Sequence, residues 1–461
     1  MRKALKVATL MGLAAALIVP AAPSAKAADM DMGSTKVTIG GQLRERLEWY
    51  GSEVGSGKGA ELGATYRARL SIKAELSNGV TAVFVPQAVG YWGQGGQGLG
   101  LSDNGDFSMH EAYMLLANPF GLNNTIVKVG RQEVNLGNQR LVGSVGWSQN
   151  GRSLDGILVG YVAGDYGLAG FFYGKLNDDG TQDAWFRPTV ENEPDIDLYV
   201  ATWQGKFKPF GIGGTYELTD IYVNPTTDFK HIDLNINTLY GRVTPAFETD
   251  MAKIKVNLEA ATQSGNAGSN DFKGYMFSVG AGADFTDVNW VPSVFVGYDY
   301  YSGDSDKTGD AKAFWSVLPT AHKWLGHADV VWVNTPFYQF NGNGLVNVAS
   351  QYVTNSKGDE FNIAGVKDLY FKLHTKPLER LALGLDLHYF KAAKTVKDLT
   401  TGQSFGKDIG WEADFAANYK YSKNLCLSLG YDYFDPDDAF KGFLGNDKAE
   451  HHVWAQADLK F

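Results

Sequence analysis

Polar and apolar residues alternate with a period of two along much of the chain. Between residues 64 and 76 the even positions are Ala, Tyr, Ala, Leu, Ile, Ala and Leu, and the odd positions are Thr, Arg, Arg, Ser, Lys and Glu. The pattern recurs at 381–390, 411–420, 425–434 and 453–461. A period of two is typical of β-strands with one apolar face. After residue 27 no run of 18 apolar residues occurs, so transmembrane helices are not expected.

The alternation and the turn residues between the segments predict 18 strands, an even number. They are expected at 36–50, 63–77, 79–90, 108–117, 124–134, 153–164, 166–176, 195–208, 210–221, 232–246, 251–263, 273–286, 291–302, 361–376, 379–391, 408–422, 424–435 and 449–461. The connections between them alternate between short turns, such as 77–79 and 376–379, and long links, such as 91–107 and 303–360. Short turns on the periplasmic side and long loops outside are typical of outer-membrane barrels.

Two architectures produce such alternation, namely a soluble sandwich or solenoid with a dry core and a transmembrane barrel with a polar lumen. The predicted strands run to ~10–14 residues, which suits a tilted bilayer crossing better than the ~5–6 residues of globular sheets. Tyr, Phe and Trp gather near strand ends, as in interfacial aromatic girdles. The terminal Phe461 resembles the signal by which assembly machinery recognises outer-membrane barrels. We therefore predict an all-β transmembrane antiparallel barrel with short periplasmic turns and long extracellular loops.

The first 27 residues have the composition of a cleaved signal peptide. Arg2, Lys3 and Lys6 precede an apolar stretch at 10–19, and Ala25-Lys26-Ala27 fits the small-x-small cleavage rule. The alternative, an N-terminal anchor, would need ~20 apolar residues. We expect residues 1–27 to be removed and residues 28–461 to form one barrel domain in the outer membrane of a Gram-negative cell.

Composition and charge narrow the class further. The 461 residues are 44% hydrophobic and 13% aromatic, which excludes a disordered chain. A single cysteine, Cys426, excludes an internal disulfide and multi-cysteine metal sites. The formal net charge of −10 argues against a nucleic-acid partner, which would require a basic face.

The polar face of the predicted strands carries many positively charged residues, even though the chain is acidic overall. The bases expected to face the lumen are Arg44, Arg46, Arg67, Arg69, Lys73, Arg242, Lys253, Lys255, Lys372 and Lys376. Rings of Arg and Lys are the means by which pores favour anions. Alternatively, these bases neutralise lumen carboxylates such as Glu48, Glu75 and Glu259 and contribute little to selection.

Several short motifs resemble the alginate-export family of outer-membrane porins. They are Gly130-Arg131-Gln132-Glu133, Arg140-Leu141-Val142-Gly143, Trp147, Gly151-Arg152-Ser153-Leu154-Asp155-Gly156, Tyr301-Ser302-Gly303-Asp304, the run 314–326 and Gly410-Trp411-Glu412-Ala413-Asp414. The resemblance extends from about residue 40 to the C-terminus. It implies a monomeric 18-stranded barrel that passes an anionic polysaccharide such as alginate through an arginine-lined constriction. Its motifs imply that Arg131 and Arg152 line this constriction, with Glu133 and Asp155 as acidic neighbours. Because Arg131 shares parity with Val127 and Val129, a bulge or a strand end is needed to turn it inward.

Other functions stay open at this stage. The chain could be a general diffusion porin for small anions, or a barrel that encloses a redox or secretion partner and needs an unplugged lumen. Expected partners are the anionic solute, membrane lipid, the barrel-assembly machinery and periplasmic export components. The link 303–360 is far longer than the others and carries Trp315, Trp324 and Trp332, so we expect it to pack over or into the lumen.

No enzymatic site, cofactor or metal site is expected. Asp304-Ser305-Asp306-Lys307-Thr308-Gly309 has the opening spacing of a calcium loop, but Trp315 stands where the bidentate Glu belongs. His322 and His327 share a loop, and His451-His452 begin the last strand, without three recognisably converging ligands. No Ser/His/acid grouping can be recognised.

Overall fold

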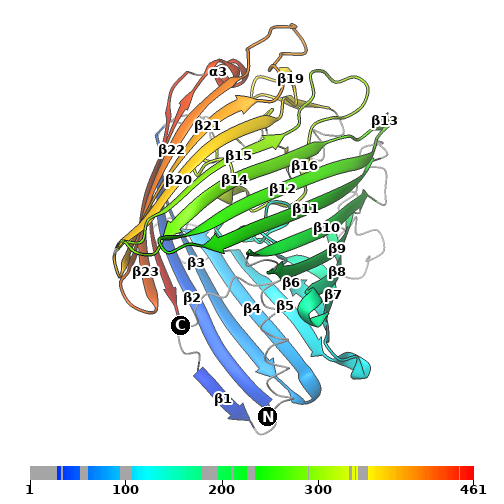
Figure 1. Ribbon diagram of the computed structural model, residues 1–461, viewed down its shortest axis with the longest axis vertical. Coiled ribbons are helices and arrows are strands. Elements are labelled where there is room, and N and C mark those ends of the chain that lie inside the picture. Colours follow the sequence, from blue (N-terminus) through cyan, green and yellow to red (C-terminus); the bar gives the residue numbers. More distant parts are fainter. Residues whose placement is uncertain are drawn as a thin grey trace.

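The computed structural model is a closed antiparallel β-barrel (Figure 1). It describes residues 28–32, 35–51, 61–93, 106–177, 196–208, 212–225, 234–288, 290–331, 335–337, 339–340, 351–445 and 447–461. The predicted signal peptide at 1–27 lies outside the described residues. No helix among the described residues is long and apolar enough to cross a membrane.

Eighteen strands form the barrel wall, as the alternation predicts. They are β2 (Thr35–Tyr50), β3 (Glu61–Glu75), β4 (Val80–Tyr91), β5 (Asp106–Ala117), β6 (Thr125–Gln132), β7 (Leu154–Val162), β8 (Leu168–Asn177), β9 (Ile196–Phe207), β10 (Gly213–Pro225), β11 (Leu234–Glu248), β12 (Ala252–Ala267), β14 (Tyr275–Phe285), β15 (Ser293–Tyr301), β20 (Val366–Leu378), β21 (Leu381–Ala392), β22 (Asp408–Lys420), β23 (Leu425–Pro436) and β24 (Glu450–Lys460). Each pairs with its neighbour in sequence, and every one of these pairings is antiparallel.

The first and last wall strands close the barrel. Strand β2 pairs with β24 from Gln42 to Tyr50. The adjoining part of the same edge pairs with β1 (Ala28–Met32), a strand that the alternation does not predict. The backbones of Gly41 and Phe461 exchange two hydrogen bonds at the closure, at 2.8 and 3.1 Å. A side chain at Gly41 would meet the Phe461 ring at 2.5 Å, so glycine leaves the space that the terminal ring occupies.

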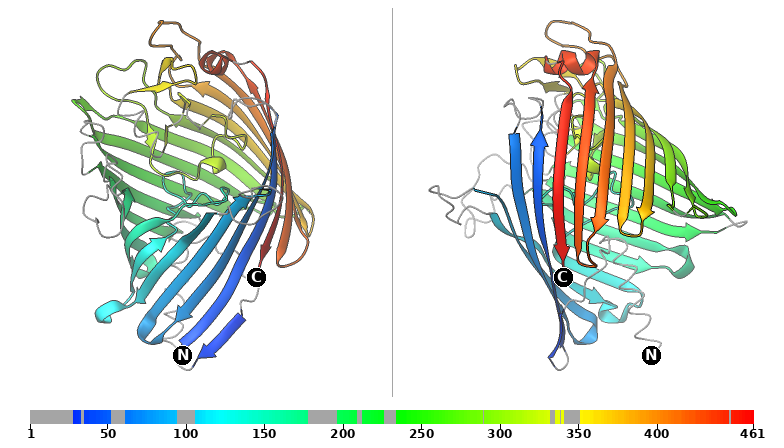
Figure 2. Two further views of the ribbon diagram at one scale, coloured as in Figure 1. Left: turned by 180° about the vertical axis from the view of Figure 1, so that it is seen from behind. Right: turned by 90° about the vertical axis from the view of Figure 1, so that its left-hand side faces the viewer.

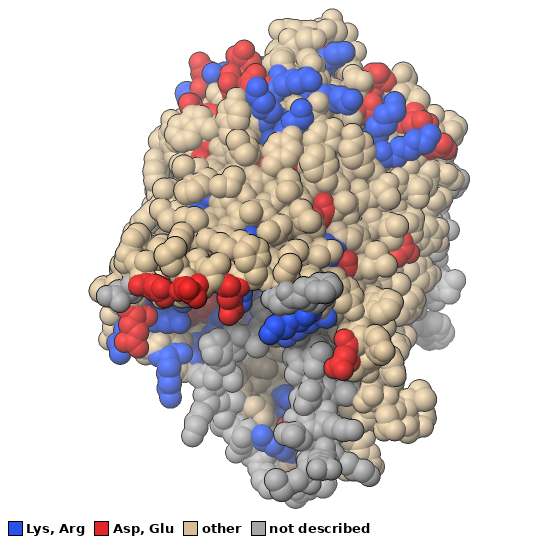
Figure 3. Space-filling model, viewed as in Figure 1, with Lys and Arg blue, Asp and Glu red and all other residues tan. Residues whose placement is uncertain are grey.

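Side chains of opposite character cover the two faces of the wall. Leu43 and Leu47 of β2 are each 40% exposed on the outer face, whereas Arg44 and Arg46 between them are 4% and 2% exposed. Strands place successive side chains on opposite faces, which explains the alternation in the sequence. In the view of Figure 3 the middle of the outer wall is largely free of charged side chains, and Lys, Arg, Asp and Glu gather toward its upper and lower ends.

The links between wall strands contain short strands and 3-10 turns. They include β13 (Asn270–Asp271), β16 (Trp315–Ser316), β17 (Gln339–Phe340), β18 (Tyr352–Thr354), β19 (Glu360–Asn362) and 3-10 turns at Ser77–Gly79, Pro119–Gly121, Gly164–Tyr166 and Ala321–Lys323. The predicted strand at 361–376 begins only at Val366, because residues 360–362 pair with β18 instead. The link 436–448 contains a helix, α3 (Asp438–Leu444), whose N-cap Asp437 accepts a hydrogen bond from the Asp438 amide.

Candidate functional site: the barrel lumen

Two long links fold into the barrel rather than away from it. Inward loop 1 is residues 133–153, between β6 and β7, and inward loop 2 is residues 302–331 and 335–337, between β15 and β20. Figure 2 shows these links running through the interior of the barrel. Phe314, Trp315 and Val317 of loop 2 are at most 2% exposed and belong to one apolar cluster with wall residues such as Leu198 and Ile221. The expectation that the long link packs into the lumen agrees with this geometry, although Trp332 lies outside the described residues.

The two inward loops are joined by backbone hydrogen bonds. The Leu318 amide donates to the Leu141 carbonyl at 2.8 Å, and the Gly143 amide donates to the Leu318 carbonyl at 2.9 Å. The Thr320 amide also donates to the Gln139 carbonyl at 3.0 Å. Buried backbone groups that lack water need such partners. The loops therefore form a single packed body inside the barrel.

Arginines on β2 and β3 hold loop 1 by its carbonyl groups. Arg44 donates to the carbonyls of residues 146, 147 and 148 and to the Gln149 side chain, at 2.8–3.0 Å. Arg67 donates to the carbonyls of residues 148 and 149, at 3.0 and 3.3 Å. Arg69 reaches the carbonyl of residue 150 at 3.2 Å. The planar, five-donor guanidinium suits several acceptors at once.

Arg46 adds an aromatic contact to this anchor. Its Nη2 atom donates to the Trp147 carbonyl at 2.7 Å, and its guanidinium carbon lies 3.6 Å from the centre of the Trp147 ring. Trp147 in turn stacks on His322 of loop 2, with ring centroids 4.1 Å apart. The four arginines of β2 and β3, which the sequence predicts to face the lumen, thus converge on loop 1, whose carbonyl groups accept hydrogen bonds from them.

Several of the predicted lumen bases also pair with the predicted carboxylates. Arg46 lies 3.5 Å from Glu48, and Lys73 lies 2.7 Å from Glu75. Arg242 lies 3.6 Å from Glu259. These carboxylates therefore neutralise part of the positive charge of the lumen.

Arg140 is the deepest anchor of loop 1. Its side chain is fully buried and forms ion pairs with Glu259 of β12 at 2.8 Å and Asp299 of β15 at 2.7 Å. It also donates to the Tyr301 hydroxyl and lies 3.9 Å from the Trp324 ring. Although burial disfavours the charge, Asp299 and Glu259 raise the pKa of Arg140 well above its usual value. The candidate constriction residues did not include Arg140, although it stands in one of the family-like motifs.

Arg152 and Glu133 lie at the two ends of loop 1. Arg152 donates to the carbonyls of Gly143, Leu318 and Pro319 and so ties the two loops together. Burial lowers the pKa of Arg152 to about 10. Glu133 lies 2.7 Å from His110 and 3.6 Å from Arg69. Through these contacts, both side chains help to hold loop 1 in place.

Arg131 and Asp155 lie apart from this group. They pair across β6 and β7 through two hydrogen bonds at 2.9 and 2.7 Å, and their side chains are 42% and 54% exposed. Asp155 shares the outward parity of Ile157 and Val159, which are 42% and 38% exposed. The strand has no bulge that turns Arg131 inward, so the structure does not bring it together with the lumen arginines.

A large cavity of about 1540 Å³ opens beside the inward loops. Its walls come from the short-turn ends of β9 to β12, β14, β15 and β20 to β22, and its far end is formed by Asn138, Lys323, Trp324 and His327 of the loops. We call this cavity the vestibule. Its lining includes seven basic residues, Lys208, Arg242, Lys253, Lys255, Lys323, Lys372 and Lys376, and five acidic ones, Glu248, Glu259, Asp284, Asp386 and Asp414.

The predicted bases Lys255 and Lys372 both face the vestibule. Lys255 pairs with Asp284, and Lys372 pairs with Asp386 at 2.6 Å. Their side chains are 47% and 27% exposed, in contrast to the buried arginines of β2 and β3. These two predicted bases are therefore accessible to a solute in the vestibule.

The segment 304–309, whose spacing resembles the start of a calcium-binding loop, forms a turn that its own acidic side chains stabilise. Asp304 accepts hydrogen bonds from the amides of Ser305 at 2.8 Å and Lys312 at 3.0 Å. Asp306 accepts from the amide and hydroxyl of Thr308, at 3.0 and 2.7 Å. The acidic side chains of this segment thus stabilise the turn of their own loop.

Comparisons with known proteins agree with this architecture. A family model described as alginate export matches residues 38–335. No curated protein sequence matches the chain. Similar solved structures include a BenF-like porin from Pseudomonas fluorescens Pf-5 (14% identity, 92% of this chain, 99% of that chain, TM-score 0.57) and Acinetobacter baumannii OccAB4 (13%, 92%, 98%, 0.58). A third is Pseudomonas aeruginosa OpdK with vanillate (10%, 92%, 98%, 0.55). At these identities the likeness shows a common fold.

Proposed function

The chain belongs to the alginate export family, and from this membership and the charge of the vestibule we propose that it passes anionic solutes, including an anionic polysaccharide such as alginate, by passive diffusion or export. Its barrel lies in the outer membrane and is of the porin type. The family and the fold indicate a channel rather than an enzyme.

The observation that carries this proposal is the excess of positive charge around the vestibule. Seven basic side chains line it against five acidic ones. Charges that line a narrow cavity with low-dielectric walls focus their field and raise the local concentration of the opposite ion. A net positive lining therefore favours an anion that enters from the short-turn end of the barrel.

Exchange of ion-pair partners offers a path for a carboxylate. Lys255 and Lys372 each hold one wall carboxylate and stay partly exposed, so each can share its ammonium group with a passing anion. Lys323 stands at the loop end of the same cavity, where its ammonium donates to the Asn138 carbonyl at 3.0 Å. Successive positive charges along a wall let a polyanion move stepwise without a single tight site.

A general porin for small anions is the second candidate. It is favoured by the likeness to OpdK, whose structure was solved with vanillate, because vanillate is a small aromatic carboxylate. A barrel that encloses a protein partner would need an open lumen, and the inward loops fill much of it. The size of the permeant anion separates the two candidate channels.

Reversal potentials in a planar bilayer test the proposal. In a KCl gradient the parent channel should prefer chloride, and the double variant Lys255→Gln/Lys372→Gln, which leaves equal numbers of acidic and basic residues in the vestibule, should lose most of that preference. The effect should grow at low salt because screening weakens. Lys391→Gln is the matched control, since Lys391 pairs with Asp408 at the opposite end of the barrel. A parent channel without anion preference would refute the proposal.

Blocking experiments then separate the two candidates. Oligouronates added on the vestibule side should interrupt the chloride current of the parent channel more strongly, at equal carboxylate concentration, than a small aromatic carboxylate does. Equal or weaker block by the oligouronates would favour the general small-anion porin. The double variant should be less sensitive to both, because each blocker is an anion.

A further inference from the structure

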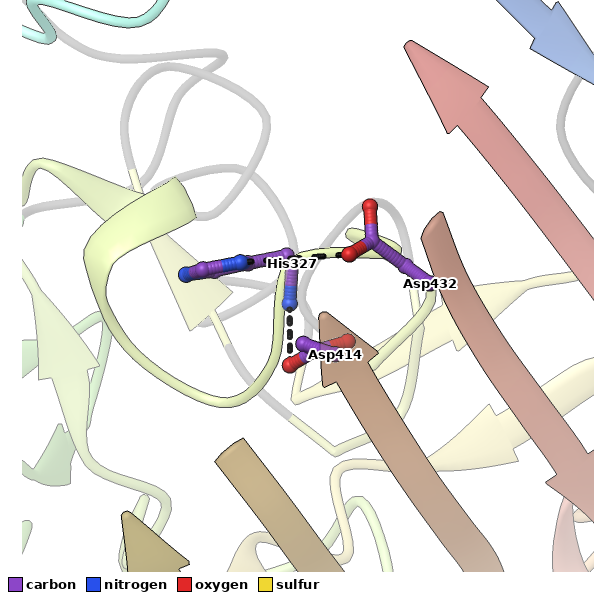
Figure 4. A group of neighbouring side chains, drawn as sticks. All are labelled: His327, Asp414 and Asp432. Carbon is purple, nitrogen blue, oxygen red and sulfur yellow. Dashed lines mark hydrogen bonds and ion pairs between the residues drawn. The ribbon is translucent and has the colours of Figure 1, made fainter. Parts of the chain in front are cut away.

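Inward loop 2 touches the barrel wall at a group of buried carboxylates. Asp414 of β22 and Asp432 of β23 point to His327 of the loop, as Figure 4 shows. The His327 amide donates to Asp414 Oδ2 at 3.2 Å, and the His327 Nδ1 atom lies 3.9 Å from Asp432 Oδ1. One ligand atom from each of the three residues lies within 4.8 Å of the other two.

The carboxylates of this group carry unsatisfied oxygen atoms. Asp414 and Asp432 are 2% and 0% exposed, yet Asp414 Oδ1 and Asp432 Oδ1 have no hydrogen-bond partner. Glu412 stands two residues before Asp414 on the same face of β22, is also fully buried, and has an unpartnered Oε2 atom. Among the described residues the basic partners of the three are histidines: His452 lies 2.9 Å from Asp432, and His388 lies 4.0 Å from Asp414. Buried carboxylates are costly unless their charge is balanced, so a cation or protons must balance the charge that these histidines leave.

The backbone of loop 2 fits closely against these side chains. The Ala328 amide donates to Glu412 Oε1 at 2.8 Å. Gly326, with φ +85°, precedes His327, and a side chain at this position would overlap the Glu412 carboxylate. Glycine is thus required for both the backbone conformation and the approach to the wall. The sequence of the loop is shaped to bring His327 to the carboxylates.

We propose that His327, Asp414 and Asp432 bind a divalent transition-metal ion of the Zn²⁺ type, which latches inward loop 2 to the wall of the barrel. Imidazole nitrogen with carboxylate oxygen is a ligand set that Zn²⁺ uses, and Ca²⁺ prefers six to eight oxygens. Two ligands on one Zn²⁺ lie roughly 3.4 Å apart in tetrahedral geometry. The 3.9 Å between His327 Nδ1 and Asp432 Oδ1 is close to this separation.

The surroundings suit such an ion in two further respects. His452 lies 2.9 Å from the other oxygen of Asp432 and fixes its orientation, as a group behind a ligand should. His327 and Asp414 both line the vestibule, which gives the ion an entry path and a position for a water ligand.

Metal binding is measured on the purified barrel in detergent, freed of metal with EDTA and re-exposed to Zn²⁺. We expect one tightly held Zn²⁺ per chain by elemental analysis after gel filtration, and visible absorption of a low-symmetry site when Co²⁺ replaces Zn²⁺. His327→Gln, Asp414→Asn and Asp432→Asn should each abolish stoichiometric binding. Asp435→Asn and His451→Gln are matched controls, because they change the neighbouring outward-facing positions of β23 and β24. A parent barrel that holds no Zn²⁺, or variants that hold as much as the parent, would overturn the site.

The effect of the ion on inward loop 2 is measured as the open fraction of the channel in a planar bilayer. This test rests on the proposed function, since it needs a conducting channel. EDTA should increase the open fraction of the parent, Zn²⁺ should reverse this, and His327→Gln should respond to neither. His327 belongs to the loop, so this variant leaves wall pairing intact, and an unchanged gel shift on boiling confirms its folding. Zn²⁺ that binds without changing the open fraction overturns the latch. A channel without anion preference refutes the proposed function instead, and elemental analysis still reports on the site.

Discussion

Replacing Arg140 by Met should release inward loop 1 from the wall. The side chain that is lost links the loop to β12 and β15 through Glu259 and Asp299, and all three side chains are at most 2% exposed. Methionine fills a similar volume but supplies no charge and no donor. Two buried carboxylates then face an apolar side chain, while the barrel wall keeps its own backbone pairing.

The expected free-energy cost depends on which partners each of the two carboxylates retains. Removing one partner of a buried ion pair costs about 3–5 kcal/mol. Glu259 retains the Tyr240 hydroxyl at 2.9 Å and Arg242 at 3.6 Å, so the loss falls mainly on Asp299. We therefore expect the lower end, about 3 kcal/mol. Because about 1.4 kcal/mol corresponds to a factor of ten, the ratio of released to docked loop should rise roughly 100-fold.

Single-channel recording measures this ratio as the open fraction and the number of conductance levels. Arg140→Met should open more often or to a higher level than the parent, provided that the gel shift on boiling shows a folded barrel. The compensated variant Arg140→Met/Glu259→Gln/Asp299→Asn should return toward the parent, because neutralising all three groups leaves no orphaned charge. Arg140→Met with parent-like gating in a folded barrel would show that Arg140 does not hold the loop.

Two further predictions concern the wall. Arg131→Ala should leave the reversal potential unchanged and lower stability by only about 0.2–1 kcal/mol, because its pair with Asp155 is exposed on the outer face; a shift toward cations would place Arg131 in the lumen. The native protein should run faster on a gel before boiling than after it, as a detergent-extracted monomer from the outer membrane, because backbone groups of the wall are satisfied only in the closed barrel; identical mobilities would contradict the closed wall.

The wall could be predicted from the sequence because one rule governs it throughout. Each wall strand has a lipid face, and the alternation of Leu425, Leu427 and Leu429 with smaller or polar residues records that face directly. All 18 strands are confirmed, with ends that differ by a few residues. β1 was not predicted, because its five residues contain no alternation long enough to identify a strand. The helix α3 was missed for a similar reason, as it has only seven residues.

The interior could be predicted only in part, because its contacts are distant in sequence. Parity correctly placed Arg44, Arg46, Arg67 and Arg69 on the inner face, but no local pattern shows that residues 146–150 return to accept their hydrogen bonds. The inward face of β9 and β10 carries Leu198, Val200 and Ile221, which match the apolar loop 2. Strands β9 and β10 carry apolar residues on both faces. This feature of the sequence indicates that an apolar segment packs against their inner face. The proposed site at His327 could not be recognised in the sequence, because its three residues come from separate segments.

The positive charges of the lumen divide into two groups with different physical roles. Arg44 and Arg67 are 4% exposed, and each donates to several fixed carbonyls, so an anion could recruit them only by displacing loop 1. Lys255 and Lys372 have one carboxylate partner each and remain open to the vestibule. A compact ammonium on a flexible stem changes partners more readily than a guanidinium held by several acceptors. Under the proposed function we therefore expect selectivity to depend on the lysines of the vestibule, and the opening of the path beyond it to depend on the arginines.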